Sequence, residues 1–316
     1  MTAASTFLGR LAYRLWFEPR AELSRRNREG WVNIFLAERG MRQMEASASR
    51  LPPTPEPDPL APEVYYLTGE KFWYQTVYCA RSLAMHCPQT PRFVILDDGS
   101  LSAARASDLR AVLTGCRIIS ASEIEARLDK HLPADQFPVL RQRRLDYPHL
   151  RKLTDIHAGS HGWKLVLDSD MLFHKRPDFL LRWLATPTAP IHMTDVENAY
   201  GYTHDLMESL TGHLIPDRVN VGVCGLNSGA LDWPCLERWC EELMLREGSH
   251  YLQEQALVAM LMSGVPHVAI SSTEAIVAPS LDECRTPSVS LHHYVADSKA
   301  WYFRSAWRDA AHKAGG

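Results

Sequence analysis

The sequence predicts an α/β protein: one domain with a mostly parallel central sheet flanked by helices, preceded by a helical extension at the N-terminus. Three observations support this prediction. From residue 63 onward, short apolar segments alternate with helical patterns. The chain has 316 residues and is 46% hydrophobic, so it can bury a full core. The first 50 residues differ in composition from the rest, and a proline-rich segment follows them.

Residues 1–50 are expected to form the helical N-terminal extension. They contain nine arginines, five glutamates and no lysine. An apolar helical face is predicted between Phe7 and Trp16, and a second helical pattern runs from about Trp31 to Met44. Two interpretations fit: a helix that lies on a membrane surface, or a helical hairpin packed on the main domain, where it could form an oligomer contact. Residues 51–62, LPPTPEPDPLAP, are predicted to be an extended, semi-rigid linker.

Residues 63–316 are expected to form the main domain, which begins with a right-handed strand, helix, strand unit. VYYLTG and RFVILDDG have the composition of buried strands, and a helix from about Gln75 to His86 joins them. LRAVLTGCRIIS predicts a further helix and strand. The later predicted elements are a helix at 149–157, strands at 163–167, in APIHMTD and in NVGVCGLN, and helices from Pro234 to Arg246 and from Gln253 to Met262.

Two aspartates directly follow the apolar segment at 163–167. Ligands of open α/β sheets bind at the carboxyl ends of the strands, which is where Asp168 and Asp170 would lie. Residues two apart on an extended chain point the same way, so the two carboxylates can share one divalent cation. The alternative is an Asp-x-Asp loop that caps the next helix or turn.

The order of these motifs resembles the family 8-like retaining glycosyltransferases, the group that contains glycogenin and the bacterial lipopolysaccharide galactosyltransferases. The resemblance covers roughly residues 63–305. It is based on LDSD after a strand, Asn220-Val221-Gly222, the pair Glu254-Gln255, and a late His-Tyr with a lysine six residues after His293. It implies a GT-A type fold. It also implies a metal-dependent transfer of a hexose from a nucleotide sugar, UDP-linked, to a hydroxyl of an unknown glycan, lipid or protein acceptor, with retention.

The resemblance implies a metal site made of Asp168, Asp170 and His293, with His292 as the competing ligand. Imidazole and carboxylate ligands suit manganese, and magnesium is the alternative. Lys299 matches the lysine that binds the diphosphate, and Trp301 matches the aromatic residue that follows it. Because the late histidine and lysine must reach the same ion as the aspartates, the stretch from about 278 to 307 is expected to close over the bound donor.

The resemblance also implies residues that bind the nucleotide and the sugar. Phe72 aligns with the aromatic that stacks on uracil, and Trp73 or Tyr74 could serve instead. Catalytic roles near the sugar fall to Gln255, Glu254 and Asp195, with Gln255 on the face where the acceptor attacks. The residues expected to bind the donor are Thr68, Phe72, Trp73, Arg151, Asp168, Ser169, Asn220, Gly222 and Lys299.

Several positions depart from the family pattern. Gly69 replaces the acidic residue that lies against the base, Ala256 a second aspartate, Ala296 a glycine and Ala300 a proline. These replacements favour an alternative, a non-catalytic protein that binds sugar nucleotides. A phosphatase of the haloacid dehalogenase type is a second alternative, because its nucleophile also lies in an Asp-x-Asp after a strand. That motif normally continues with Thr or Val, whereas Met171 follows here.

Composition excludes other classes. The formal net charge of −3 argues against nucleic acid as a partner. The seven cysteines are scattered without C-x-x-C spacing, so neither a disulfide framework nor a zinc site is indicated. The apolar face near the N-terminus is interrupted by Arg10 and Arg14, and no apolar run reaches the roughly 18 residues of a membrane span. A cytoplasmic protein is expected, at most peripheral at the inner membrane face.

Overall fold

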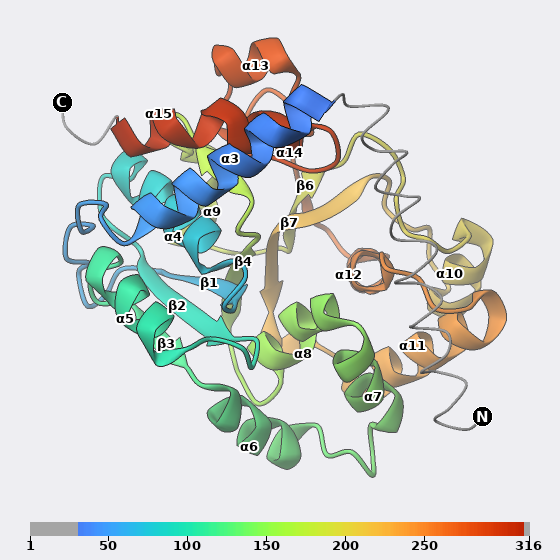
Figure 1. The fold of residues 1–316 in the computed structure, drawn as a ribbon. Coiled ribbons are helices and arrows are strands. Elements are labelled where there is room, and N and C mark those ends of the chain that lie inside the picture. Colours follow the sequence, from blue (N-terminus) through green and yellow to red (C-terminus); the bar gives the residue numbers. More distant parts are fainter. Residues whose placement is uncertain (1–30, 313–316) are drawn as a thin grey trace.

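A computed structural model describes residues 31–312 of the chain (Figure 1). Its centre is a seven-stranded sheet with the order β3-β2-β1-β4-β7-β6-β8. Strand β7 runs antiparallel to its neighbours β4 and β6, and the remaining pairs are parallel. The strands are β1 (Glu63–Thr68), β2 (Arg92–Asp97), β3 (Arg117–Ile119), β4 (Trp163–Leu167), β6 (Ile191–Thr194), β7 (Val219–Asn227) and β8 (Val268–Ile270). The predicted α/β architecture with a mostly parallel sheet is confirmed.

The helices cover both faces of this sheet. This is required because consecutive residues of the central strands are buried and successive residues point to opposite faces. In β1, Val64 and Tyr66 face one apolar cluster and Tyr65 faces the other. The first cluster lies against α3 (Trp31–Ala48), α4 (Trp73–His86), α5 (Ala103–Val112), α9 (Asp178–Ala185) and α15 (Trp307–His312). The second lies against α6 (Ala121–His131), α7 (Pro138–Asp146), α8 (Arg151–His157), α10 (His204–Thr211), α11 (Trp233–Glu247) and α12 (Gln253–Met262).

A second, three-stranded sheet brings distant parts of the chain together. Its order is β5-β10-β9, with β5 (Met171–Phe173), β9 (Ala275–Val277) and β10 (Leu291–His293). Strand β10 runs antiparallel to β5, which follows the Asp-x-Asp motif directly. The C-terminal part then continues through α13 (Leu281–Arg285) before β10, and through α14 (Ser298–Trp301) and the π-helical turn η4 (Tyr302–Ala306) after it.

Helix α3 packs along the C-terminal helices, as Figure 1 shows. Met44 and Ala48 are buried in the first apolar cluster. A Cβ on Gly40 would lie only 1.8 Å from the carbonyl oxygen of Phe303, so the backbones of α3 and η4 cross closely at this glycine. The helical face expected between Phe7 and Trp16 lies outside the described residues.

The proline-rich segment is extended and bonded to the main domain. Thr54 is buried, its N–H donates to the carbonyl of Val112, and its Oγ1 accepts from the N–H of Thr114. The Nε of Arg81 on α4 donates to the carbonyl of Pro52. The division of the chain at residues 50 and 62 remains a prediction.

Two further features bear on the expectations about disulfide bonds and membrane spans. All seven cysteines are free thiols. Among residues 31–312, no helix is both long and apolar enough to cross a membrane.

Candidate active site

The Asp-x-Asp motif lies at the carboxyl end of β4, as predicted. Residues Lys164–Leu167 are buried, and the motif continues the pairing with β7, because the N–H of Asp168 donates to the carbonyl of Gly222. Between the aspartates, Ser169 turns toward α4, where its Oγ lies 2.7 Å from Oγ1 of Thr76. The side chains of Asp168 and Asp170 are 26% and 17% exposed, so both carboxylates can still reach a ligand.

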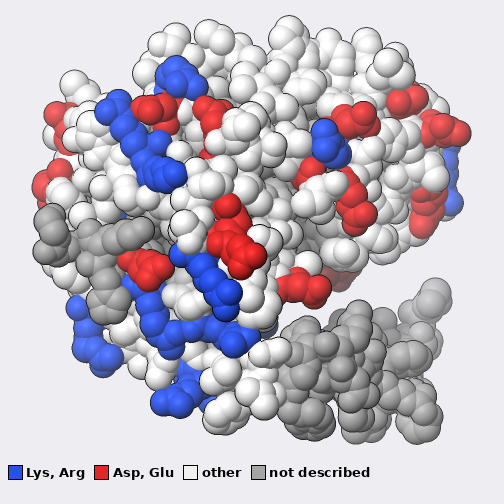
Figure 2. Space-filling view, turned by 90° about the horizontal axis from the view of Figure 1, so that it is seen from above, with Lys and Arg blue, Asp and Glu red and all other residues white. Residues whose placement is uncertain are grey.

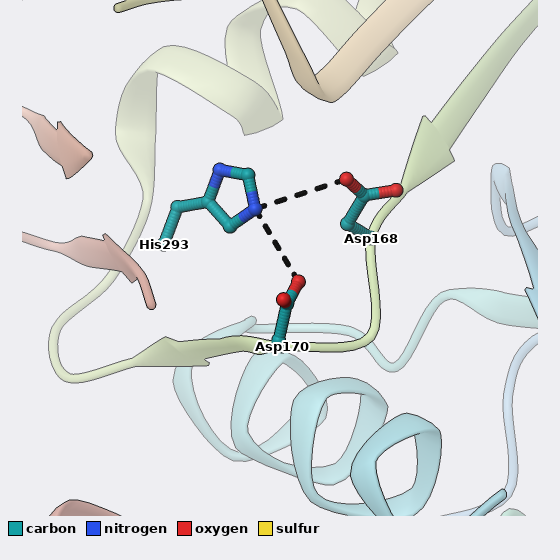
Figure 3. A group of neighbouring side chains, drawn as sticks. All are labelled: Asp168, Asp170 and His293. Carbon is teal, nitrogen blue, oxygen red and sulfur yellow. Dashed lines mark ion pairs between the residues drawn. The ribbon is translucent and has the colours of Figure 1, made fainter. Parts of the chain in front are cut away.

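His293 completes a cluster with the two aspartates (Figure 3). Its Nε2 lies 3.3 Å from Oδ1 of Asp170 and 3.7 Å from Oδ2 of Asp168. The pairing of β10 with β5 causes this approach, because His293 lies opposite Met171 and the N–H of Tyr294 donates to the carbonyl of Asp170. One ligand atom from each of the three residues fits within 4.8 Å of the others.

The neighbouring His292 points away from the cluster. Its Nε2 lies 2.8 Å from Oε1 of Glu283, and its Nδ1 lies 3.1 Å from the hydroxyl of Tyr294. Successive residues of a strand face opposite sides, so only one of the two histidines can face the aspartates.

Asn220 and Gly222 on β7 hold the imidazole of His293 in place. Oδ1 of Asn220 accepts a hydrogen bond from the N–H of Gly222 and lies 3.1 Å from Nδ1 of His293. This arrangement assigns the Nδ1 proton to the bond with Asn220 and turns Nε2 toward the aspartates. A Cβ at position 222 would lie 2.5 Å from Nδ1 of His293, so the ring needs a glycine there.

Charges within the cluster shift the pKa values of its members. Burial alone would raise the pKa of Asp170, but hydrogen bonds and positive charge from His293 and Lys299 outweigh it and hold this pKa well below its usual range. Burial alone would lower the pKa of His293, but its bond to Asp170 and the negative charges of both aspartates raise it. The site therefore stabilises the carboxylate of Asp170 in the ionised form that binds cations.

A cavity of about 340 Å³ opens beside the cluster, at the carboxyl ends of β1 and β4. Lys299 on α14 reaches it from the C-terminal part of the chain, and its Nζ lies 3.1 Å from Oδ2 of Asp170. Six of the residues expected at the site line this cavity, namely Thr68, Phe72, Asp168, Ser169, Asp170 and Lys299. The other lining residues are Leu67, Gln75, Asp98, Pro148, His149 and Lys152.

The three consecutive aromatic residues divide between this cavity and the core. Phe72 lines the cavity and is 41% exposed. Trp73 is fully buried, with the guanidinium of Arg105 4.6 Å from its ring centroid. Tyr74 is also buried, and its hydroxyl accepts from Nε2 of Gln75. Only Phe72 is placed to contact a ligand.

Lys152 is the main site residue that the sequence reasoning missed. It is buried, and its Nζ lies 2.9 Å from Oδ1 of Asp168 and 3.3 Å from Oε2 of Glu254. Its neighbour Arg151, the residue expected here, instead donates to the backbone carbonyls of Asp98 and Arg144. Neighbours on a helix point about 100° apart, and the pattern of 149–157 did not show which one faces the sheet.

Lys152 places one ammonium between two carboxylates. Burial would lower its pKa, but the charges of Asp168 and Glu254 raise it, so Lys152 stays protonated. Burial also raises the pKa of Glu254 to about 7, against the opposing effect of Lys152. Glu254 therefore takes up a proton near neutral pH.

Three of the residues expected near the sugar, Asp195, Asn220 and Gln255, form one hydrogen-bonded group. Nδ2 of Asn220 donates to Oδ2 of Asp195 at 2.9 Å. Nε2 of Gln255 donates to the same oxygen at 3.3 Å and to the carbonyl of Ala199 at 2.8 Å. The side chain of Glu254 pairs instead with Lys152, which also contacts Asp168. Asn220, Glu254 and Gln255 are all buried.

Two departures from the family pattern have a structural explanation. A Cβ at Gly69 would lie 1.9 Å from Oδ1 of Asp98, so the Asp98 loop leaves no room for a larger residue. Ala296 has a φ of +47°, in the left-handed region that glycine favours. The backbone at Ala296 therefore has the left-handed conformation that a glycine would favour, although the residue is an alanine.

Comparisons with known proteins support the fold. The chain matches no protein-family model, and no curated protein sequence matches it. Among solved structures, it is similar to a galactosyltransferase, LgtC, in complex with donor and acceptor sugar analogues, with a TM-score of 0.50 and 16% identity over 79% of this chain and 95% of that one.

Two other glycosyltransferases have comparable similarity. Mouse xyloside xylosyltransferase 1 gives a TM-score of 0.50 and 12% identity over 76% of this chain and 99% of that one. The bifunctional glycosyltransferase WbbM gives a TM-score of 0.52 and 12% identity over 82% of this chain and 51% of that one. The expected resemblance is thus confirmed in fold: the chain has the GT-A type fold of these glycosyltransferases.

Proposed function

We propose that this protein is a glycosyltransferase that uses a divalent metal ion and moves a hexose from a nucleotide sugar, UDP-linked, to a hydroxyl acceptor. The main support is one observation. Asp168 and Asp170, in the loop between β4 and β5, and His293, at the end of β10, converge at the edge of a cavity that Lys299 also lines. Carboxylates, an imidazole and an ammonium around one cavity suit a diphosphate that is bound with a cation.

The side chains fit a metal ion by their chemistry. Two carboxylates and one imidazole nitrogen are ligands that manganese accepts, and magnesium is the weaker alternative. The hydrogen bond between Asn220 and Nδ1 of His293 is the outer contact that ligating histidines need. When bound, the ion would neutralise charge on the leaving diphosphate.

The protein itself would bind and orient the donor. Phe72 would stack on the base, with Thr68 and Ser169 beside the nucleoside, and Lys299 would pair with the phosphates as a point charge. Asp98 lies next to Gly69, the position where the family has its acidic residue. We propose that Asp98 supplies the missing carboxylate from the neighbouring loop.

Asp195, Glu254 and Gln255 would act on the sugar. Nε2 of Gln255 is occupied by Asp195 and Ala199, which leaves Oε1 to face positive charge that develops on the anomeric carbon. In a transfer with retention, the acceptor attacks from the side of the departing diphosphate, and a phosphate oxygen takes its proton. We propose this course because the carboxylates that line the cavity already have other assigned roles, Asp168 and Asp170 at the metal and Asp98 at the nucleobase. Among the described residues, no lining carboxylate is left to act as a separate nucleophile.

A screen of nucleotide sugars by thermal shift, with and without manganese, tests this proposal. A ligand that binds only the folded state raises the melting temperature by mass action. We expect UDP-sugars with manganese to give the largest rise, and the matching sugar to be consumed in a transfer assay. Binding without turnover of any donor would favour the non-catalytic alternative, and release of phosphate without nucleotide would favour the phosphatase.

An aspartate variant separates the metal site from general folding. Asp170→Asn should abolish the effect of manganese on the melting temperature and nearly all transfer, because a neutral amide is a poor ligand for a hard cation. Asp135→Asn, at an exposed position away from the cavity, is the charge-matched control. Normal turnover in a folded Asp170→Asn protein would reject the assignment.

The cellular location is also a proposal. A cytoplasmic site, with peripheral contact at the inner membrane face through residues 1–50, would give the enzyme access to nucleotide sugars. Fractionation of cells that produce the tagged chain tests it.

A further inference from the structure

A second cavity lies on the opposite side of α14 from the donor cavity. Its volume is about 620 Å³, and it lies between α3, α13 and the C-terminal helices. Four of its lining residues are arginines, and none is acidic. The full lining is Leu36, Arg39, Gln43, Leu281, Arg285, Trp301, Arg304, Ser305 and Arg308.

The α3 wall of this cavity is held in a defined position. Residues 36, 39 and 43 follow the i, i+3, i+7 spacing of one helical face, while Gly40 and Met44 face η4 and the core. Nη1 of Arg304 donates to Oδ1 of Asn33 at 2.8 Å, and Nη2 of Arg308 donates to Oε1 of Gln43 at 2.7 Å. These two bonds join α3 to the C-terminal helices.

The arginines keep their positive charge. Arg304 and Arg308 bond to neutral oxygens and lie over the rings of Trp301 and Trp307, and such partners orient a guanidinium without cancelling its charge. Arg285 is paired with Asp282, at 3.6 Å in a largely exposed pair that solvent screens. Figure 2 views this side of the molecule and shows several Lys and Arg side chains on it, with Asp and Glu side chains among them.

We propose that this cavity binds a phosphomonoester that carries an apolar chain. Guanidinium groups match the oxygens of a phosphoryl group in pairs, and a doubly charged phosphomonoester suits several arginines better than a carboxylate does. Leu36, Leu281 and the ring of Trp301 provide the apolar surface for the chain. The site is separate from the donor cavity, but both include α14, through Trp301 here and Lys299 there.

Calorimetric titration of the full chain with dihexanoyl phosphatidic acid, below its micelle concentration, tests the proposal. We expect one saturable site, with inorganic phosphate as a weaker competitor. The double substitution Arg39→Gln and Arg285→Gln should weaken binding by about tenfold or more, because it removes two charge-assisted contacts. Both side chains are exposed, so the fold should be unaffected, which circular dichroism checks.

Arg42→Gln is the matched control. It removes one positive charge, where the cavity variant removes two, from an exposed position of α3 that does not line the cavity, so binding should change less than about twofold. Equal losses in Arg42→Gln and in the cavity variant would overturn the proposal in favour of a diffuse basic surface. Binding to vesicles with anionic lipid, without binding to the soluble phosphatidic acid, would also overturn it. The titration uses neither metal nor nucleotide, so its failure would leave the proposed transferase activity intact.

Discussion

Replacing Lys152 with methionine should destabilise the protein and change how its stability depends on pH. The substitution keeps the aliphatic stem but removes the ammonium that faces Asp168 at 2.9 Å and Glu254 at 3.3 Å. Glu254 is nearly inaccessible, with 6% of its side chain exposed, so water cannot replace the lost partner. Breaking a buried ion pair by removing one partner costs about 3 to 5 kcal/mol, and we expect a loss of this order at pH 8.

The dependence on pH follows from Glu254. Its pKa in the folded protein is raised from 4.5 to about 7. Between these values the folded state keeps a proton that the unfolded state releases, so stability falls by about 1.4 kcal/mol per pH unit as the pH rises. In wild type this fall ends near pH 7, where Glu254 ionises against Lys152. Without Lys152 the pKa rises further and the fall continues above pH 7.

Urea denaturation at pH 6 and pH 8 measures the effect. The difference in unfolding free energy between wild type and Lys152→Met should grow by roughly 1 kcal/mol from pH 6 to pH 8. When both proteins carry Glu254→Gln, the effect of Lys152→Met should not grow with pH, because the amide does not titrate. Manganese should stabilise Lys152→Met more than wild type, since a cation would then compensate Asp168. A loss of unfolding free energy below about 1 kcal/mol at both pH values would refute this account of Lys152. Removing one partner of a buried ion pair of this kind should cost more than that.

Three further predictions concern other parts of the molecule. Burial and the charges of Lys164 and Arg127 lower the pKa of His157 to about 3, so the unfolded state alone takes up a proton below about pH 6.5. This group alone should therefore lower stability by about 2 kcal/mol between pH 6.5 and pH 5, against the opposite contribution of Glu254. The difference in unfolding free energy between His157→Gln and wild type should shift by this amount in favour of the variant over this range in urea denaturation. Closure over the donor should be limited to residues 295–301, because β10 is paired on both sides and Tyr302 is fully buried. Hydrogen exchange with UDP and manganese should show new protection of these residues. Equal protection without ligand would indicate that this segment is a fixed wall of the cavity. Deleting residues 1–30 should leave the melting temperature and nucleotide binding unchanged. Deleting residues 1–48 should lower the melting temperature, because this deletion removes Met44 and Ala48 from the core. Equal melting temperatures for the two deletion variants would contradict the packing of α3.

The local sequence was sufficient to predict the α/β class and the position of the two aspartates at the carboxyl end of β4. The apolar composition of β1 and β2, and the helical pattern between them, depend only on residues close in the chain. Asp168 and Asp170 end an apolar strand, and the carboxyl end of such a strand is where ligands bind, whatever the rest of the fold. These features could be predicted because each depends on backbone geometry within a few residues.

Other features of the site depend on contacts between distant segments, which no local pattern contains. Whether His292 or His293 faces the aspartates depends on the register of β10 against β5. Lys152, rather than Arg151, faces Asp168 because of the rotation of α8 against the sheet, and Phe72 alone reaches the cavity because α4 buries its two neighbours. Local sequence sets the direction of a side chain relative to its own backbone, but the packing of one element on another decides what that side chain meets.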